Sequence, residues 1–304
     1  MKHLLTLKEL NEYELLSIIQ KAIELKKQPD AFFEACYRKG LLMLFQKTST
    51  RTNLSFQSGM NQMGGYCVPM DWDSSNFSLS PIQYEVRYAS RNCDLIMARL
   101  KNHDDMLQLA SYSSVPVING CCNKYHPCQA LADFMTIYEV SGTFNDITLT
   151  YVGIHNNVAN SLIIGCLTLG IKLLLVTPII NDTSWDEELM LAARQSGHIY
   201  TVENLSDAVS QSDYVYTDTW IDMEHFHEIE YQEEKQRRIQ TMLPFQVSRA
   251  HLSGYSPYIM HDMPVHPGYE IEESLIESDT SVIYQQAENR MHAQKALMLH
   301  LLQK

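Results

Sequence analysis

The feature that most constrains the fold is the alternation of short apolar runs with amphipathic stretches along most of the chain. Each apolar run is bounded by glycine or polar residues and is short enough to indicate a buried strand. Strands that alternate with helices in this way are typical of parallel sheets covered by helices on both faces. The sequence therefore predicts an α/β fold with doubly wound parallel sheets.

The apolar runs fall into two series, separated by a turn-rich segment at 141–146. The expected strands are 41–45, 64–70, 93–100, 114–120, 147–153, 171–177, 198–202, 213–220 and 282–286. The expected helices include 104–112, 126–140, 156–169, 184–196 and 205–211. We interpret the two series as two domains, 1–140 and 146–285, with a C-terminal helix at 286–304 that returns to the first domain.

A further helix is expected near the N-terminus. Thr6 and Glu9 have the spacing of a capping box, in which each side chain bonds to the backbone amide of the other residue. The apolar residues that follow recur at helical spacing and include Leu10, Tyr13 and Leu16. The sequence therefore predicts that a helix begins after Thr6, with Tyr13 on its buried face.

Size and composition exclude several classes of function. The chain has 304 residues, 45% of them apolar, enough for one large or two ordinary domains. A formal charge of −13, without a basic block, argues against a surface that binds nucleic acid or an anionic membrane. No apolar run approaches the roughly 18 residues that cross a bilayer, and the N-terminus lacks a signal-peptide pattern. We therefore expect a cytoplasmic protein with small ligands.

The seven cysteines are an odd number and lack the spacing of a zinc site. We expect them to be reduced thiols, most of them buried, and we expect no metal site.

Residues 49–52, Ser-Thr-Arg-Thr, lie where the strand at 41–45 gives way to a helix. Hydroxyl side chains at this position can simply cap the helix, because the first backbone amides have no partner within it. The alternative is an anion site, in which those amides, the helix dipole, the hydroxyls and Arg51 together hold a phosphate. These four residues leave both interpretations open.

Other polar residues stand at the predicted ends of further strands. In open parallel sheets, ligands bind beyond the carboxyl ends of the strands. A single arginine or histidine there is usually structural, but the recurrence of such residues at successive strand ends favours a ligand site. The candidates are Ser49–Thr52, Arg99, His126, Gln129, Asn156, Asn157, Asp218, His261–Pro264 and Arg290.

The chain resembles the aspartate/ornithine carbamoyltransferase family nearly from end to end. The resemblance is carried by FQKTSTRT at 45–52, HPCQALAD at 126–133, YVGIHNNVANS at 151–161, DYVYTDTW at 213–220, HDMP at 261–264 and AENR at 287–290. It implies two α/β domains, of which the first binds carbamoyl phosphate, and transfer of the carbamoyl group to an amine without a metal or organic cofactor. By analogy it also implies a homotrimer or a multiple of trimers.

The resemblance also assigns residues to the two substrates. Those implied to bind carbamoyl phosphate are Ser49, Thr50, Arg51, Thr52, Arg99, His126, Gln129, Met263 and Arg290, of which Arg51, Arg99 and His126 are the catalytic candidates. Those implied to bind the acceptor amine are Asn157, Asp218, Asp222, Met223 and Asp262. Donors placed around the carbonyl oxygen would stabilise the oxyanion that develops as the amine attacks.

The acceptor residues depart from the pattern usual for ornithine enzymes. That pattern is DxxxSMG and HCLP, whereas this chain reads DTWIDME at 218–224 and HDMP at 261–264. Asp222, Glu224 and Asp262 thus replace serine, glycine and cysteine, and clustered carboxylates favour a cationic acceptor over aspartate. Ornithine is the leading acceptor. The alternatives are a diamine such as putrescine, another diamino acid, or a family member that binds its ligand without catalysis.

Overall fold

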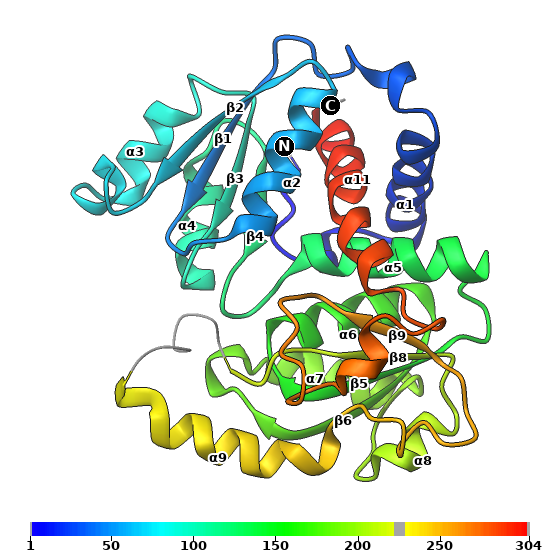
Figure 1. Cartoon of the computed structure of the whole chain (residues 1–304). Coiled ribbons are helices and arrows are strands. Elements are labelled where there is room, and N and C mark those ends of the chain that lie inside the picture. The colour runs from blue at the N-terminus through cyan, green and yellow to red at the C-terminus, as the bar shows by residue number, and fades with distance from the viewer. Residues whose placement is uncertain (1, 222–228, 303–304) are drawn as a thin grey trace. The chain divides into compact units, whose positions relative to one another are not determined.

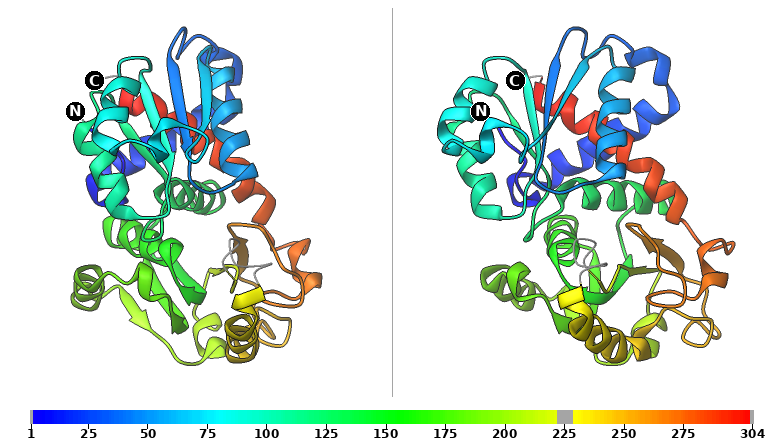
Figure 2. Two further views of the ribbon diagram at one scale, coloured as in Figure 1. Left: turned by 90° about the vertical axis from the view of Figure 1, so that its left-hand side faces the viewer. Right: turned by 60° about the vertical axis from the view of Figure 1, so that its left-hand side comes forward.

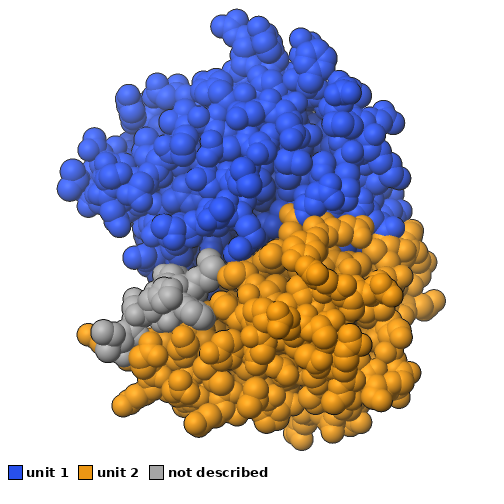
Figure 3. Space-filling model, viewed as in Figure 1, with its two compact units in different colours: residues 1–139, 288–304 blue, residues 140–287 orange. Residues whose placement is uncertain are grey.

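The computed structural model describes residues 2–221 and 229–302, which form two compact units (Figure 3). Unit 1 comprises Met1–Glu139 and Glu288–Lys304, and unit 2 comprises Val140–Ala287. The chain returns to unit 1 within one helix, α11 (Ile283–Leu302). Each unit contains one sheet whose strands are all parallel, so the predicted α/β fold is confirmed.

The sheet of unit 1 has the order β2-β1-β3-β4 (Figure 1). Its strands are β1 (Gly40–Phe45), β2 (Tyr66–Asp71), β3 (Leu95–Arg99) and β4 (Val117–Cys121). Leu42, Leu44 and Ile96 pack against α3 and α4 on one face. Because side chains alternate along a strand, Leu41 and Met43 point to the opposite face. The helices of this unit are α1 (Glu12–Lys27), α2 (Thr50–Gln62), α3 (Ile82–Ala89), α4 (His103–Tyr112), α5 (Pro127–Ser141) and most of α11.

The sheet of unit 2 has the order β7-β6-β5-β8-β9. Figure 2 shows this unit, coloured green to orange, from two further sides. Its strands are β5 (Thr148–His155), β6 (Lys172–Ile180), β7 (Ile199–Thr201), β8 (Tyr214–Thr217) and β9 (Tyr258–His261). Val152, Val215 and Ile259 on adjacent strands share one apolar cluster with Val209 of α8 and Ile271 of a long loop. The helices are α6 (Asn157–Leu169), α7 (Glu187–Ser196), α8 (Leu205–Val209), α9 (Gln232–Met242) and α10 (Glu273–Ile276).

The predicted strand at 282–286 is wrong. Ile283 begins α11, and only Ser281, just before it, makes an isolated bridge to Ile259 of β9. The apolar run is short and continues directly into Gln285 and the good helix formers that follow it, so helix propensity prevails. Among the described residues, one strand and three α-helices were not predicted at all: the four-residue strand β9, which follows Pro257, and helices α3, α9 and α10.

The predicted start of the first helix is also wrong. The capping box of Thr6 and Glu9 exists, but it caps only a 3₁₀ turn at Leu7–Glu9 that ends at the extended Leu10. Helix α1 instead begins after Asn11, whose side chain forms a second capping box with Glu14. The buried face of α1 is formed by Leu15, Ile18, Ile19, Ala22 and Leu25, and Tyr13 lies outside it, 80% exposed. The other 3₁₀ helices are Pro29–Phe32, Asn76–Ser78, Asp182–Ser184, Ile229–Tyr231 and Leu243–Phe245.

The parallel sheets position the candidate residues. In unit 1, the segments that leave the carboxyl ends of β1, β3 and β4 carry Ser49–Thr52, Arg99 and His126. In unit 2, the ends of β5, β8 and β9 lead to Asn156, Asp218 and Asp262. Strands β1 and β3, and strands β8 and β9, are direct neighbours, so residues distant in sequence lie at one edge of each sheet.

Candidate active site

The Ser49–Thr52 segment forms the first turn of α2. Ser49 is extended, with φ −160° and ψ 108°, and its Oγ accepts a hydrogen bond from the backbone N–H of Thr52 at 3.2 Å. The capping interpretation is therefore correct for Ser49. It does not exclude an anion site, because a helix N-terminus presents several amides and the positive end of the helix dipole.

Thr52 links two arginines from distant parts of unit 1. Its fully buried Oγ1 accepts from Nη2 of Arg290 at 3.1 Å and from Nη1 of Arg99 at 3.5 Å. Arg99 is the last residue of β3, and Arg290 lies on α11. One hydroxyl thus holds two guanidinium groups next to the start of α2.

His126 lies in the field of three arginines. Burial lowers the pKa of its imidazole well below the ordinary value, and the charges of Arg290, Arg99 and Arg51 lower it further. The histidine is therefore neutral, and its ring can donate one hydrogen bond. Three like charges held around one buried group repel one another, and a small dianion would relieve that repulsion.

Gln129 is oriented by Asp133, four residues later on α5. Its Nε2 donates to Asp133 Oδ1 at 2.8 Å, and both side chains are fully buried. Because a carboxylate only accepts, the amide oxygen of Gln129 faces away from it. This oxygen has no hydrogen-bond partner among the described residues, so it can accept from a ligand N–H. Asp133 was not among the predicted site residues, although its i, i+4 spacing from Gln129 could have revealed it.

Asp218 follows β8 directly and is 3% exposed. Its Oδ2 accepts from Asn156 Nδ2 at 2.6 Å, and its Oδ1 accepts from the Thr219 backbone N–H at 2.6 Å. Asn156 also caps α6, since its Oδ1 accepts from the amides of Val158 and Ala159. Because Oδ1 of Asn156 accepts from α6, the Nδ2 end of its amide is the one that faces Asp218. Asn157, the residue predicted to bind the acceptor, is the first residue of α6.

Asp262 brings a second carboxyl group to Asp218. It follows β9, and its side chain is 12% exposed. Because Thr217 and His261 are partners in the register of β8 and β9, Asp218 and Asp262 follow adjacent strand ends. Burial raises the pKa of Asp218 well above the ordinary value, and the adjacent Asp262 raises it further.

The chain behind Asp262 is held by Glu270. Its Oε1 lies 3.0 Å from Nε2 of His261 and accepts from the backbone N–H of His266 at 2.6 Å. Burial alone would raise the pKa of Glu270, but hydrogen bonds from the two histidines lower it to about 2. Glu270 was not among the predicted site residues. It lies nine residues from His261 in a loop, where no periodic pattern marks it.

Asp222, Met223 and Glu224 lie outside the described residues. Met263, grouped by resemblance with the carbamoyl-phosphate residues, belongs to unit 2, whereas the other eight residues of that group belong to unit 1. Its backbone N–H donates to Nδ1 of His261 at 2.8 Å.

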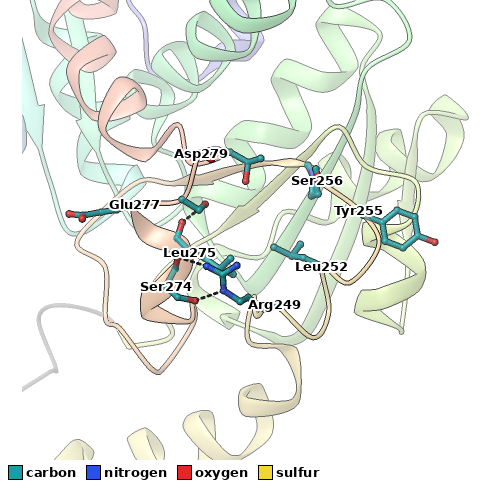
Figure 4. Close-up of a pocket in the computed structure, with 11 residues that line it drawn as sticks. Arg249, Leu252, Tyr255, Ser256, Ser274, Leu275, Glu277 and Asp279 are labelled. Atoms are coloured by element: carbon teal, nitrogen blue, oxygen red, sulfur yellow. Dashed lines mark hydrogen bonds between the residues drawn. The ribbon is translucent and has the colours of Figure 1, made fainter.

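Unit 2 has a separate surface pocket (Figure 4). It lies between helix α10 and the segment that follows α9. Arg249 crosses it and donates to the side chain and the backbone carbonyl of Ser274. None of the predicted site residues lines this pocket. Among the residues with assigned positions, no helix has the length and apolar character needed to span a membrane.

Comparisons with known proteins agree with the geometry of both units. Residues 2–139 match the family described as aspartate/ornithine carbamoyltransferase, carbamoyl-P binding domain. Residues 145–301 match the aspartate/ornithine carbamoyltransferase, Asp/Orn binding domain.

Relatives and solved structures cover nearly the whole chain. The ornithine carbamoyltransferase of Archaeoglobus fulgidus is 38% identical over 310 residues, covering 100% of this chain and 98% of the relative. That of Shewanella oneidensis is 38% identical over 308 residues, with 99% of each chain covered. The solved ornithine carbamoyltransferase of Pyrococcus furiosus has a TM-score of 0.89 at 36% identity, covering 98% of this chain and 96% of that one. The resemblance in the sequence is thus confirmed, and the chain belongs to the aspartate/ornithine carbamoyltransferase family.

Proposed function

We propose that this protein transfers the carbamoyl group of carbamoyl phosphate to the side-chain amine of L-ornithine, giving citrulline and phosphate. The observation that carries the proposal is geometric: the buried hydroxyl of Thr52, in the first turn of α2, accepts hydrogen bonds from the guanidinium groups of Arg99 and Arg290. Such a cluster suits a small phosphate ester whose carbonyl oxygen gains negative charge during the reaction.

In this proposal the groups of unit 1 divide the work on carbamoyl phosphate. Ser49, Thr50 and Thr52 offer hydroxyls and first-turn amides to the phosphate, together with Arg290. Arg51, Arg99 and His126 stabilise the oxyanion, and removing one such donor typically raises a barrier by about 3 kcal/mol. The amide oxygen of Gln129 accepts from the carbamoyl N–H₂, so it distinguishes this group from an ester or a simple acyl group.

The acceptor side rests on the carboxyl pair of unit 2. Asp218 and Asp262 attract an ammonium group, whereas the side-chain carboxylate of an aspartate acceptor would be repelled. Asn157, Asp222 and Met223 remain in the proposal as further acceptor-binding residues, and Met263 remains a carbamoyl-phosphate-binding residue. The relatives named above are ornithine carbamoyltransferases, which favours ornithine over a diamine, another diamino acid or ligand binding without catalysis. A homotrimer, or a multiple of trimers, in the cytoplasm completes the proposal.

The test is the formation of a radiolabelled ureido product from labelled carbamoyl phosphate and a panel of amines. Ornithine should give citrulline at the highest kcat/KM, ahead of putrescine, lysine, 2,4-diaminobutyrate and aspartate. A chelator should leave the rate unchanged, because no step of the proposal uses a metal ion. A higher kcat/KM for putrescine than for ornithine would move the assignment to a diamine. Binding of carbamoyl phosphate without any product would indicate a non-catalytic protein.

A further inference from the structure

The carboxylate of Asp218 is held at both of its oxygens. An aspartate side chain turns easily about its last bond, so a single hydrogen bond does not fix the plane of the carboxylate. At Asp218, Oδ1 accepts from the backbone N–H of Thr219 and Oδ2 accepts from Nδ2 of Asn156, each at 2.6 Å. The first donor is the next residue in the chain. The second comes from the neighbouring strand, because β5 pairs with β8 and Asn156 follows β5 directly.

The amide group of Asn156 is itself held in one orientation. Its Oδ1 accepts from the backbone N–H groups of Val158 and Ala159 at 2.9 and 3.1 Å, which caps α6. The hydroxyl of Tyr151 lies 3.3 Å from the same oxygen. An amide has one accepting end and one donating end, so Nδ2 faces Asp218 once Oδ1 is turned to α6. The start of α6 thus determines, through one side chain, how the carboxylate is oriented.

A helix cap by itself does not need the amide nitrogen. Helix α8 is capped in the same way, with Oδ1 of Asn204 accepting from the backbone N–H groups of Ser206 and Asp207 at 2.8 and 3.2 Å. Asn204 is exposed, and its Nδ2 makes no hydrogen bond within the described part of the chain. Serine and aspartate cap helices about as well as asparagine, but only asparagine adds a separate N–H donor to the accepting oxygen. Asn156 uses both ends of its amide.

The hydrogen bond from Asn156 also opposes the cost of burying Asp218. Asp218 is 3% exposed, and burial raises the pKa of its carboxyl group, whereas the hydrogen bond from Asn156 lowers that pKa. An N–H donor stabilises the ionised carboxylate, which is the form that attracts an ammonium group. Because a carboxylate can accept about four hydrogen bonds, those from Asn156 and Thr219 leave it able to accept from a ligand.

We propose that Asn156 is a positioning residue for the acceptor: its Nδ2 sets the orientation in which the Asp218 carboxylate receives an ammonium group, and its Oδ1 ties that orientation to the start of α6. This inference rests on the proposed function for the identity of the acceptor. Asn156 takes part in no bond-making step in this role. It should therefore act on the binding of the acceptor and leave the binding of carbamoyl phosphate unchanged.

The first experiment separates the cap from the hydrogen bond to Asp218. Asn156→Ser keeps a capping oxygen, but its shorter side chain ends before the position of Nδ2 and loses the donor. Since a hydrogen bond to a charged group is worth about 10-fold or more in affinity, KM for ornithine should rise about 10-fold or more. The dissociation constant of carbamoyl phosphate should not change. Asn204→Ser, the same substitution at the cap of α8, should alter neither constant. An ornithine KM that is equal in the two variants, or an equal loss of affinity for both substrates in Asn156→Ser, would overturn the proposal.

The second experiment shows whether Asn156 acts through Asp218 or on the acceptor site as a whole. Norvaline and 5-aminovalerate keep the carbon chain of ornithine, and each lacks a different one of its ammonium groups. Their inhibition constants against ornithine are measured for the unchanged protein, Asn156→Ser and Asn204→Ser. The analogue that retains the ammonium group held by Asp218 should bind about 10-fold more weakly to Asn156→Ser, and the other should bind equally to all of the proteins. Equal weakening of both analogues, or of neither, would overturn the role of Asn156.

Failure of this inference and failure of the proposed function can be told apart. Citrulline formation with the same ornithine KM in both serine variants would reject the positioning role and leave the activity intact. A protein that makes no citrulline, but that binds ornithine about 10-fold more weakly in Asn156→Ser than in Asn204→Ser by calorimetry, would keep the positioning role and lose the assigned transfer.

Discussion

Replacing Glu270 with glutamine tests how the segment that carries Asp262 is held in place. Glu270 is fully buried and accepts hydrogen bonds from His261 and His266. Burial alone would raise the pKa of its carboxyl group, but these hydrogen bonds lower it to about 2 from 4.5. Glutamine keeps the size of the side chain and one accepting oxygen, so the substitution removes mainly the negative charge.

The pKa of Glu270 gives the size and the sign of the effect. At about 1.4 kcal/mol for each pKa unit, the carboxylate contributes about 3 kcal/mol to the free energy of unfolding. Because the pKa in the folded protein lies below that in the unfolded chain, this contribution is complete above about pH 5 and is lost as the pH falls toward 2. Glu270→Gln should therefore be about 3 kcal/mol less stable at pH 7, and the difference should shrink to about half by pH 3.

The assay is urea denaturation at several pH values, with hydrogen exchange of peptides from residues 140–287 to report on unit 2. Glu273→Gln, at an exposed position of α10, is the matched control and should change stability little at any pH. A deficit in Glu270→Gln that is the same at pH 7 and pH 3 would show that packing, rather than the charge, is responsible. No deficit at pH 7 would refute the reasoning entirely.

Three further substitutions have defined outcomes. Arg51→Ala should lower the rate of citrulline formation at least 100-fold without changing the urea midpoint, since one oxyanion donor is worth about 3 kcal/mol; the exposed Arg194→Ala is its control, and a near-normal rate would remove Arg51 from the site. Asn156→Ala should cost about 1 kcal/mol or more in urea denaturation, because it removes the α6 cap and a donor to Asp218; unchanged stability would contradict the role of the cap. Lys295→Met should raise the urea midpoint at pH 7, because Lys295 is fully buried with its pKa lowered mainly by burial; its advantage should shrink at alkaline pH, where the lysine is deprotonated, and a lower midpoint would refute this.

The sequence by itself determined the fold class and the unit 1 residues to examine. Alternating apolar runs predicted parallel sheets because buried strands and their covering helices leave local, periodic patterns. Ser49 is found at the N-terminus of α2, and Arg99 is the last residue of its strand. Such features depend only on residues that are neighbours in the chain, so a single sequence is enough to predict them. The assignments of these residues to carbamoyl phosphate remain predictions.

The tertiary structure decided which distant residues meet. Asp218 and Asp262 are brought together because β8 and β9 are neighbours in the sheet, and β9 itself was too short to be predicted. The folding of the whole chain also brings Thr52 to Arg290 and His261 to Glu270. Residues 283–286 form the first turn of α11, although the apolar residues of the run suggested a strand. Contacts of this kind depend on strand order and burial, which are properties of the whole chain and leave no local pattern in the sequence.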